Sequence, residues 1–326
     1  MSILYRGYEK LPNRAVGWGD AFEYDLACYL HAKEKGYKDE DIYIVFPRFG
    51  YESDKWGDLG DKYYYQPTNF LPWNHYPRNK EIDKFEWEEI IDTTQQDSLY
   101  EGFPGIQKTG VYIYMYFNIY HYIYKKRPYL DIPRTNKDKS YILFQTRNNN
   151  MGSFSNARIT NEDNLLYMYN NIKDKLGDKY EYWKTGEPTS IDDRFDNIVP
   201  MMYDDLDLFM EIIRNSSLVV GTHSGPPQMA FYFEDVPVIR FDMVSAGNLM
   251  DADIKPQEKS SILGFDLGLA KKYNIPYSPS FFEGNMLYRR KEIFPDEGNR
   301  IELTYSDLGD LPSKEDIQWV LESNNL

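Results

Sequence analysis

A polar turn in the second half of the chain carries residue types that could bind an anion. Residues 217–233 read SLVVGTHSGPPQMAFYF, where an apolar run that predicts a buried strand precedes a segment with helical character. The residues of the turn are Thr222, His223, Ser224 and Gly225. The first amides of a helix lack internal partners and carry partial positive charge, so such a turn is typical of a phosphate site. An ordinary strand-to-helix turn is the alternative.

A second candidate lies in GWGDAFEYDLACYL, residues 17–30. Two glycines permit a tight turn and a close approach of the backbone, and Asp20 falls at or near the start of a predicted helix, where capping the helix is the alternative role of its carboxylate. The segment is not a dinucleotide fingerprint, because Phe22 stands where the third glycine would be. The G-x-x-x-x-G-K-[ST] phosphate loop does not occur in the sequence.

A third candidate is FQTRNNNMGSFSNAR, residues 144–158, which joins a strand end to two arginines. Arg147 and Arg158 each carry a planar fork of donors that suits phosphate oxygens. At the mouth of a parallel sheet the pair could neutralise a diphosphate. Arginines on a solvated surface are the alternative.

Composition limits the possible partners and the compartment. The net charge of −15, from 37 basic and 52 acidic residues, disfavours nonspecific attraction to nucleic acid or anionic lipid. A single cysteine, Cys28, excludes an internal disulfide and a metal site built from cysteines, which fits a reducing cytoplasm. No secretory signal and no apolar run of about 20 residues is visible, so no transmembrane segment is expected.

The second half of the chain alternates between strands and helices. Strands are predicted at 140–146, 179–185, near 197–202, at 217–222 and at 236–241. Helices are predicted over 165–176, over 205–216 and from Pro227. Thr160 with Asp163 is predicted to cap the first of these helices, and Gly177 to end it. This alternation predicts an α/β fold, a doubly wound parallel sheet with its ligand site at the carboxyl ends of the strands.

The first half is less regular. A helix is predicted over 21–36, a strand over 41–49, long loops over 50–108 and a helix over 111–126. A chain of 326 residues exceeds the usual size of one core, and prolines and charges cluster near residue 130. We therefore expect two domains, 1–134 and 135–326. The C-terminal helix could pack on either domain, including back on the first.

Together these segments resemble the GT-B glycosyltransferases, and most closely the lipopolysaccharide heptosyltransferase family. The likeness is carried by the G-x-G-D turn at 17–20, the strand end with a following arginine, and V-V-G-T-x-S-G at 219–225. It extends over most of the chain in the same order. It implies two Rossmann-like doubly wound domains that face each other across a cleft, with 1–134 on the acceptor side and 135–326 on the donor side.

The resemblance also implies roles for residues. Asp20 matches the catalytic base of the family, Arg158 its cationic phosphate ligand, and Ser224 with Gly225 its donor-phosphate turn. Glu187, in WKTGEP, matches an acidic residue that contacts the nucleotide ribose. The remaining residues predicted to bind the donor are Gly19, Arg147, Thr222, His223 and Gln228. The implied reaction is an inverting sugar transfer from a nucleotide-diphosphate donor to a glycan hydroxyl, without a metal or other cofactor.

Two departures leave the donor open. His223 stands where the family has an aspartate, and Gln228 stands where it has a histidine. The segment GWGDAFEYDLACYL is also similar to the G-x-G-N-x-x-F-x-Y-A turn of GDP-fucose-dependent fucosyltransferases. Both an ADP-heptose-like and a GDP-fucose-like donor are therefore consistent with the sequence. The acidic chain favours a neutral glycan or glycolipid acceptor.

Other functions are considered beside this one. A metal-dependent GT-A transferase would use Asp205 and Asp207 as a D-x-D site, although both fall in a run with helical spacing. A noncatalytic module that binds nucleotide sugars or glycans is a second alternative. A Ser/His hydrolase is disfavoured, because His223 and Ser224 are adjacent and no G-x-S-x-G elbow occurs.

Overall fold

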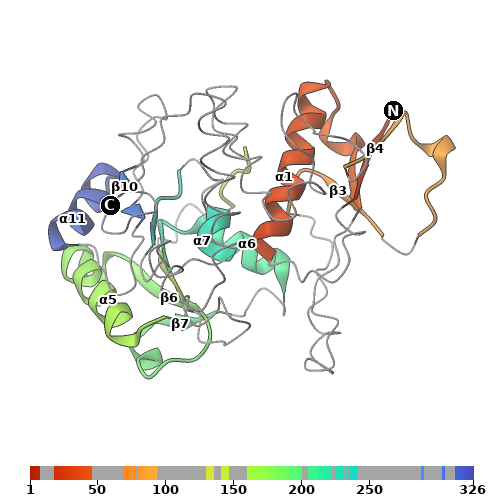
Figure 1. Cartoon of the computed structure of the whole chain (residues 1–326). Coiled ribbons are helices and arrows are strands. Elements are labelled where there is room, and N and C mark those ends of the chain that lie inside the picture. Colours follow the sequence, from red (N-terminus) through yellow and green to blue (C-terminus); the bar gives the residue numbers. More distant parts are fainter. Residues whose placement is uncertain are drawn as a thin grey trace, which may run out of the picture. The chain divides into compact units, whose positions relative to one another are not determined.

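The chain divides into two compact units, each of which contains a parallel β-sheet (Figure 1). The first unit comprises Met1–Pro128 with Pro200–Glu211, and the second comprises Tyr129–Val199 with Ile212–Leu326. The computed structural model describes residues 1–7, 18–45, 70–77, 80–93, 130–135, 141–146, 160–199, 205–221, 225–230, 233, 235–240, 288–289, 303–304 and 313–326. The predicted helix over 111–126 lies outside these residues, and the predicted boundary at 134/135 stays a prediction.

The first unit contains a four-stranded sheet in the order β3-β2-β1-β4, with every pairing parallel. Its strands are β1 (Ile3–Arg6), β2 (Ile42–Val45), β3 (Asn74–Tyr76) and β4 (Glu89–Asp92). Its helical elements are α1 (Trp18–Glu34) and the short η2 (Asp39–Asp41) and η4 (Lys84–Glu86). Thr93 donates from its backbone N–H and from Oγ1 to the carbonyl of Arg6, at 2.8 and 2.9 Å. This contact joins the carboxyl ends of β4 and β1.

The prediction of long loops over 50–108 was wrong for two segments, because β3 and β4 lie inside that range. β1 was also not predicted. These strands have only three or four residues, and β3 reads NHY and β4 reads EIID. Such short sequences show no clear alternation, and they form strands by pairing with β2 and β1.

α1 packs its apolar stripe into the core of the first unit. Phe22, Leu26 and Leu30 recur every four residues and are buried, as expected for one face of a helix. The same helix also buries Asp25, whose Oδ2 lies 2.7 Å from Nε2 of His75 on β3. Burial raises the pKa of Asp25, and the hydrogen bond and charge of His75 partly oppose that shift. This polar contact ties α1 to the edge of the sheet.

A second polar contact joins α1 to β1. The hydroxyl of Tyr5 lies 2.6 Å from Nδ1 of His31, and Tyr5 is buried while His31 is half-buried. Burial raises the pKa of Tyr5, so the phenol stays neutral. Burial, with a smaller effect from the charge of Lys35, lowers the pKa of His31 to about 4. The folded chain therefore keeps a neutral imidazole at pH values where a free histidine is charged.

This histidine predicts a specific loss of stability in acid. Above pH 6.5 the folded and unfolded chains both hold a neutral His31, so this group contributes no pH dependence. Between pH 6.5 and about 4 the unfolded chain binds a proton that the folded chain does not, so stability falls as pH falls. We expect His31→Asn, whose amide oxygen can still accept from Tyr5, to lose less stability than the wild type between pH 7 and pH 5.

Urea midpoints at the two pH values measure the difference. Carboxylates titrate in both proteins, so their effect cancels in the comparison. Equal losses in the wild type and in His31→Asn would contradict the lowered pKa.

The second unit contains a seven-stranded sheet in the order β10-β11-β9-β8-β5-β6-β7. All its pairings are parallel except that of β10 with β11. The strands are β5 (Tyr141–Thr146), β6 (Glu181–Gly186), β7 (Asn197–Ile198), β8 (Leu218–Gly221), β9 (Val238–Arg240), β10 (Tyr288–Arg289) and β11 (Leu303–Thr304). The helical elements are α5 (Glu162–Leu176), η6 (Gly177–Lys179), η7 (Asp192–Arg194), α7 (Gly225–Ala230) and α11 (Lys314–Ser323). One further helix, α6 (Leu206–Asn215), begins in the first unit and passes into the second at Ile212. The predicted α/β fold class with parallel sheets is confirmed.

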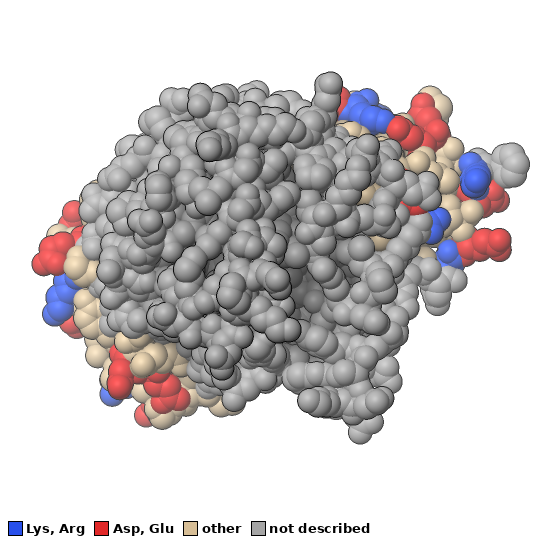
Figure 2. Space-filling view, in the orientation of Figure 1, with Lys and Arg blue, Asp and Glu red and all other residues tan. Residues whose placement is uncertain are grey.

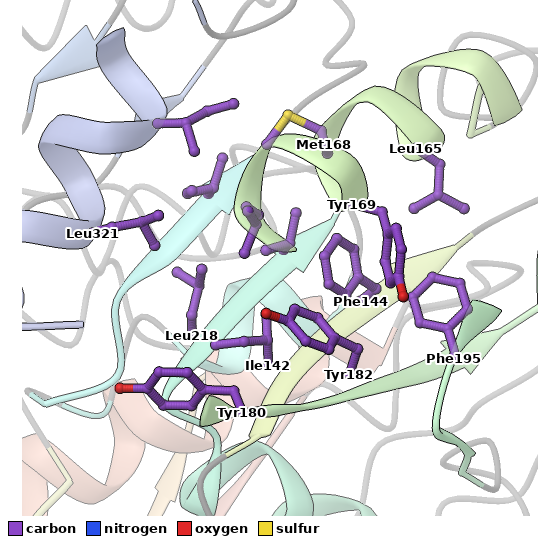
Figure 3. Packing of buried hydrophobic residues seen from close by; sticks show 14 of the residues in the cluster. Ile142, Phe144, Leu165, Met168, Tyr169, Tyr180, Tyr182, Phe195, Leu218 and Leu321 are labelled. Carbon is purple, nitrogen blue, oxygen red and sulfur yellow. The ribbon is translucent and has the colours of Figure 1, made fainter. Parts of the chain in front are cut away.

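The core of this unit lies between the sheet and α5 (Figure 3). Ile142 and Phe144 of β5 and Tyr182 of β6 are buried on the face that α5 covers. Met168 and Tyr169 of α5 pack on them. Burying such side chains stabilises a fold by about 1.5–3 kcal/mol each, so this cluster holds the sheet and helix together.

The ends of α5 follow the sequence closely. Gly177 ends the helix with a positive φ of 59°, as predicted. The predicted capping residue Thr160 is buried, and the N-cap is instead the next residue, Asn161. Oδ1 of Asn161 accepts from the N–H groups of Asp163 and Asn164, at 2.9 and 3.2 Å. Asparagine caps a helix as well as threonine does, and Thr160 and Asn161 are consecutive in the sequence.

Residues 130–135, where the chain enters the second unit, are bonded to it. Arg214 donates to the carbonyl of Ile132 and, at 2.8 Å, to Oδ1 of Asp235. Arg134 donates to Oδ2 of the same carboxylate at 2.8 Å. Burial alone would raise the pKa of Asp235, but the two guanidinium groups hold it below its usual range. The entering segment is thereby fixed beside the end of α6.

The C-terminal helix, α11, lies on α5 of the same unit (Figure 1). Ile317, Val320 and Leu321 join the core cluster, and Lys175 donates to Gln318 at 2.6 Å. A packing of this helix on the first unit stays a prediction.

Acidic and basic side chains lie beside one another on the described surface that Figure 2 presents. In the described parts of the chain, no helix combines the length and apolar character needed to cross a bilayer.

Candidate functional site

The connections of the second unit create a switch point beside β5. From β5 the chain passes through α5 to β6 and on to β7 on one side, and then through α6 to β8 on the other side of β5. The carboxyl ends of β5 and β8 therefore lie next to each other while the helices that follow them leave in different directions. Ligands of open α/β sheets bind at such a point.

Gly221, the last residue of β8, allows a close approach at this point. A Cβ built on it would lie 2.8 Å from Cγ of Pro227 in α7 and 2.9 Å from Oε1 of Gln145 in β5. Real Cβ atoms essentially never come so near to such atoms, so a larger residue would push these groups apart. Nε2 of Gln145 donates to the carbonyl of Thr146 at 2.7 Å, which fixes the amide. The glycine thus brings α7 down onto the ends of the two strands.

Gly186, the last residue of β6, makes a similar approach on the other side of β5. Its φ is +98°, a conformation that only glycine adopts without strain. A Cβ here would lie 2.0 Å from the carbonyl oxygen of Thr146. The chain can therefore turn sharply at the edge of the sheet and run across the end of β5.

Glu187 follows this turn, and two hydrogen bonds to its backbone carbonyl hold it in place. Its carbonyl accepts a hydrogen bond from Oγ1 of Thr146 at 2.8 Å and another from Nζ of Lys184 at 2.8 Å. The residue is half-buried. No ion pair within the described residues engages its carboxylate. A carboxylate in this position can accept hydrogen bonds from ligand hydroxyl groups.

Lys184 is buried, and its partner Asp192 compensates the charge. Nζ lies 3.0 Å from Oδ1 of Asp192, which also accepts from the N–H and hydroxyl of Thr189. Burial alone would raise the pKa of Asp192, but the hydrogen bonds from Thr189 and Lys184 and the charge of Lys184 lower it. The residues from Gly186 to Asp192 therefore form a loop closed by charged and neutral hydrogen bonds.

The structure describes only part of the predicted site. Gly225 opens α7 and Gln228 lies within it, while the side chain of Gln228 is outside the described atoms. Gly19 and Asp20 lie in the first turn of α1, again without a described side chain. Residues outside the described ranges are Arg147, Arg158, Thr222, His223 and Ser224. Their contacts, and a cleft between Asp20 and the donor turn, stay predictions.

The aspartates of the alternative D-x-D site have a structural use. Asp205 precedes α6, and its Oδ1 accepts from the N–H of Leu208 at 3.0 Å. Its carbonyl accepts from the N–H of Phe209. Asp205 is thus the N-cap of α6, and Asp207 lies in the first turn, where acidic residues suit the helix dipole. No group of metal-ligating side chains occurs within the described ranges.

Sequence reasoning missed Thr146, Lys184 and Asp192. A signal was present for the lysine, because KYEYWKT places a cation inside a predicted parallel strand, where both faces are usually apolar. A buried cation requires a carboxylate partner nearby, and the sequence has two aspartates at 192–193. The choice between them depends on the turn at Gly186, which the sequence does not specify.

Comparisons with known proteins show similarity to glycosyltransferases at low identity. An iron-containing dodecameric glycosyltransferase, TibC from enterotoxigenic E. coli H10407, is 12% identical with a TM-score of 0.41 over 73% of this chain and 57% of that one. A family 9 glycosyl transferase from Veillonella parvula is 10% identical, with a TM-score of 0.39 over 83% and 96%. The E. coli heptosyltransferase WaaC with ADP is 10% identical, with a TM-score of 0.33 over 84% and 99%. This chain thus spans just over half of TibC. Neither a family model nor a curated protein matches the sequence.

The approach of Gly186 to Thr146 predicts an unusually costly substitution. Gly186→Ala must adopt a strained φ and also displace a carbonyl group 2.0 Å away, so we expect it to lose about 3 kcal/mol or more of stability. Gly177→Ala is the matched control in the same unit, since its φ is +59° with nothing within 4 Å of the new Cβ. That variant carries the cost of the backbone conformation alone, about 1–3 kcal/mol, and should therefore lose less stability than Gly186→Ala. Urea unfolding measures both, and equal losses would contradict the contact.

Proposed function

We propose that this protein is an inverting, metal-independent glycosyltransferase that moves a sugar from a nucleotide-diphosphate donor to a glycan hydroxyl. The observation that carries the proposal is the arrangement at the carboxyl edge of the second sheet. There Gly186 and Gly221 bring two turns against the end of β5, and Glu187 is held at the same edge. The proposal rests on this edge and not on the solved structures compared above, whose TM-scores lie below 0.5.

The donor would lie across the ends of β5, β6 and β8. Arg147 follows the last residue of β5 directly in sequence, and Thr222 follows the last residue of β8. Arg147, Arg158 and the turn from Thr222 to Gly225 would hold the diphosphate and stabilise the charge that grows on it as the sugar leaves. Glu187 would accept hydrogen bonds from the ribose hydroxyls. His223 and Gln228 would line the donor site near this turn.

Asp20 would act as the base. It would accept the proton of the acceptor hydroxyl as the oxygen attacks the anomeric carbon from the face opposite the leaving diphosphate, which inverts that carbon. The reaction needs no cofactor beside the donor, because guanidinium groups and backbone amides do the work that a metal does in other transferases. The acceptor is a glycan or glycolipid.

A screen for the donor tests the binding part of the proposal. A ligand that binds only the folded chain raises its apparent stability by mass action. We expect one class among GDP-, ADP-, UDP- and dTDP-sugars to raise the melting temperature, and EDTA to leave that shift unchanged. The result that counts against the proposal is a melting temperature that none of the four changes. A shift that requires a divalent metal would favour the metal-dependent alternative instead.

Catalysis is tested with the donor that the screen selects. Asp20→Asn removes the base, so we expect donor turnover to fall by about 10²- to 10⁴-fold while donor affinity stays the same. Glu34→Gln makes the same chemical change at the far end of α1 and should keep wild-type turnover. Turnover is measured as release of the nucleoside diphosphate. Tight binding without any turnover by the wild type would favour the noncatalytic binding module.

A further inference from the structure

A fully buried lysine in the middle of a parallel strand calls for an explanation. Lys184 has 0% exposed surface and pairs in register with Phe144 of β5 and Ile198 of β7. Desolvating an ammonium group costs several kcal/mol, and replacing a buried ion pair by apolar residues is often neutral or stabilising. The fold alone therefore does not require a lysine here.

The ammonium group of Lys184 reaches the loop at the edge of the sheet. Nζ donates to the carbonyl of Glu187, three residues later, at 2.8 Å, and contacts Oδ1 of Asp192 at 3.0 Å. Asp192 is in turn bonded to the N–H and hydroxyl of Thr189. The lysine thus joins the first part of the loop to its last part.

The carbonyl of Glu187 is held from two strands at once. Lys184 approaches it from β6, and Oγ1 of Thr146 approaches it from the end of β5. Two donors on one carbonyl fix the backbone of Glu187, and they thereby fix the position of the Cα atom from which its side chain extends. Because Asp192 already compensates the charge of Lys184, the lysine does not draw the Glu187 carboxylate into an ion pair.

We propose that Lys184 is a positioning residue for donor binding, which acts by holding the backbone of Glu187 so that its carboxylate meets the nucleotide ribose. This inference rests on the proposed function. A binding group gains affinity when the surrounding structure fixes it before the ligand arrives, since the cost of ordering it is then already met by folding. Lys184 itself does not touch the donor.

The experiment compares the binding of nucleoside diphosphates, which contain the ribose, with the binding of pyrophosphate, which does not. Lys184→Met keeps the length of the buried chain and removes the ammonium group, and Asp192, with 29% of its side chain exposed, can still be solvated. Binding of ADP, GDP, UDP and dTDP is measured by calorimetry, with inorganic pyrophosphate in parallel. We expect the nucleoside diphosphate that the wild type binds to bind about tenfold more weakly to Lys184→Met. The reason is that the Glu187 carboxylate is no longer held in place and loses its hydrogen bond to the ribose. Pyrophosphate affinity should stay the same.

A double-mutant cycle distinguishes positioning from general stabilisation. Glu187→Ala removes the carboxylate and keeps the carbonyl that Lys184 holds. If Lys184 acts through Glu187, then Lys184→Met causes no further loss of nucleotide affinity in the Glu187→Ala background. An equal loss in both backgrounds, or an equal loss of pyrophosphate affinity, would overturn the inference.

Amide hydrogen exchange supplies a readout that needs no ligand. Lys184→Met should raise exchange across residues 186–192 and leave α5 protected, and unchanged exchange in the loop would also overturn the inference. If Lys184→Met does not fold, Thr146→Val is the second variant, because it removes the other donor to the carbonyl of Glu187. It should likewise weaken nucleotide binding and leave pyrophosphate affinity unchanged. A wild-type chain that binds none of the four nucleotides would overturn the proposed function, and the exchange rates would then decide the positioning role alone.

Discussion

The burial of β5 is the constraint on which the second unit depends. All six residues of this strand are buried, because β6 and β8 pair with its two edges and α5 packs on one face. A strand enclosed in this way is apolar along most of its length, and in β5 the side chains of Gln145 and Thr146 stand together at the carboxyl end. The packing that stabilises the sheet thereby confines any chemistry to one edge.

Two contacts between ionisable side chains involve buried residues, one in each unit. Within the described residues, Lys184 pairs with the partly exposed Asp192 in the second unit, and the fully buried Asp25 pairs with His75 in the first. Such contacts add little net stability, because desolvation offsets most of the attraction. Each also bridges two elements, since Nζ of Lys184 bonds the carbonyl of Glu187 and His75 of β3 bonds Asp25 of α1. In the second unit that bridge lies at the proposed donor site, and in the first it orients the helix that carries Asp20.

Much of the fold of the second unit could be predicted from its sequence because elements such as β5, β6 and α5 are long and strongly patterned, whereas β10 and β11, with two residues each, were not predicted. Strands such as β5 and β8 and the helix α5 show their character without any partner, and Gly177 marks a helix end by its own conformational freedom. β3 and β4 could not be predicted, because strands of three and four residues are too short to show a period and are held by pairing with β2 and β1.

The candidate site likewise has one part that could be predicted from the sequence and one part that could not. The glycine-rich turn after β8 is visible in the sequence, whereas the contacts around Glu187 are not. Its carbonyl is bonded to Thr146, 41 residues earlier, and that contact depends on the sharp turn at Gly186. Long-range pairing of this kind is a property of the folded sheet and not of any local segment.

The bonds of residues 130–135 to the second unit bear on how this unit could be studied by itself. Arg214 and Asn215 at the end of α6 bind Ile132 and Thr135, and Asp235 binds Arg134. A fragment that began at residue 136 would leave a largely buried guanidinium and a buried amide without these partners, a loss of about 1–3 kcal/mol for each group. A fragment made to study the second unit should therefore keep residues 130–135, whose hydrogen bonds place them in that unit.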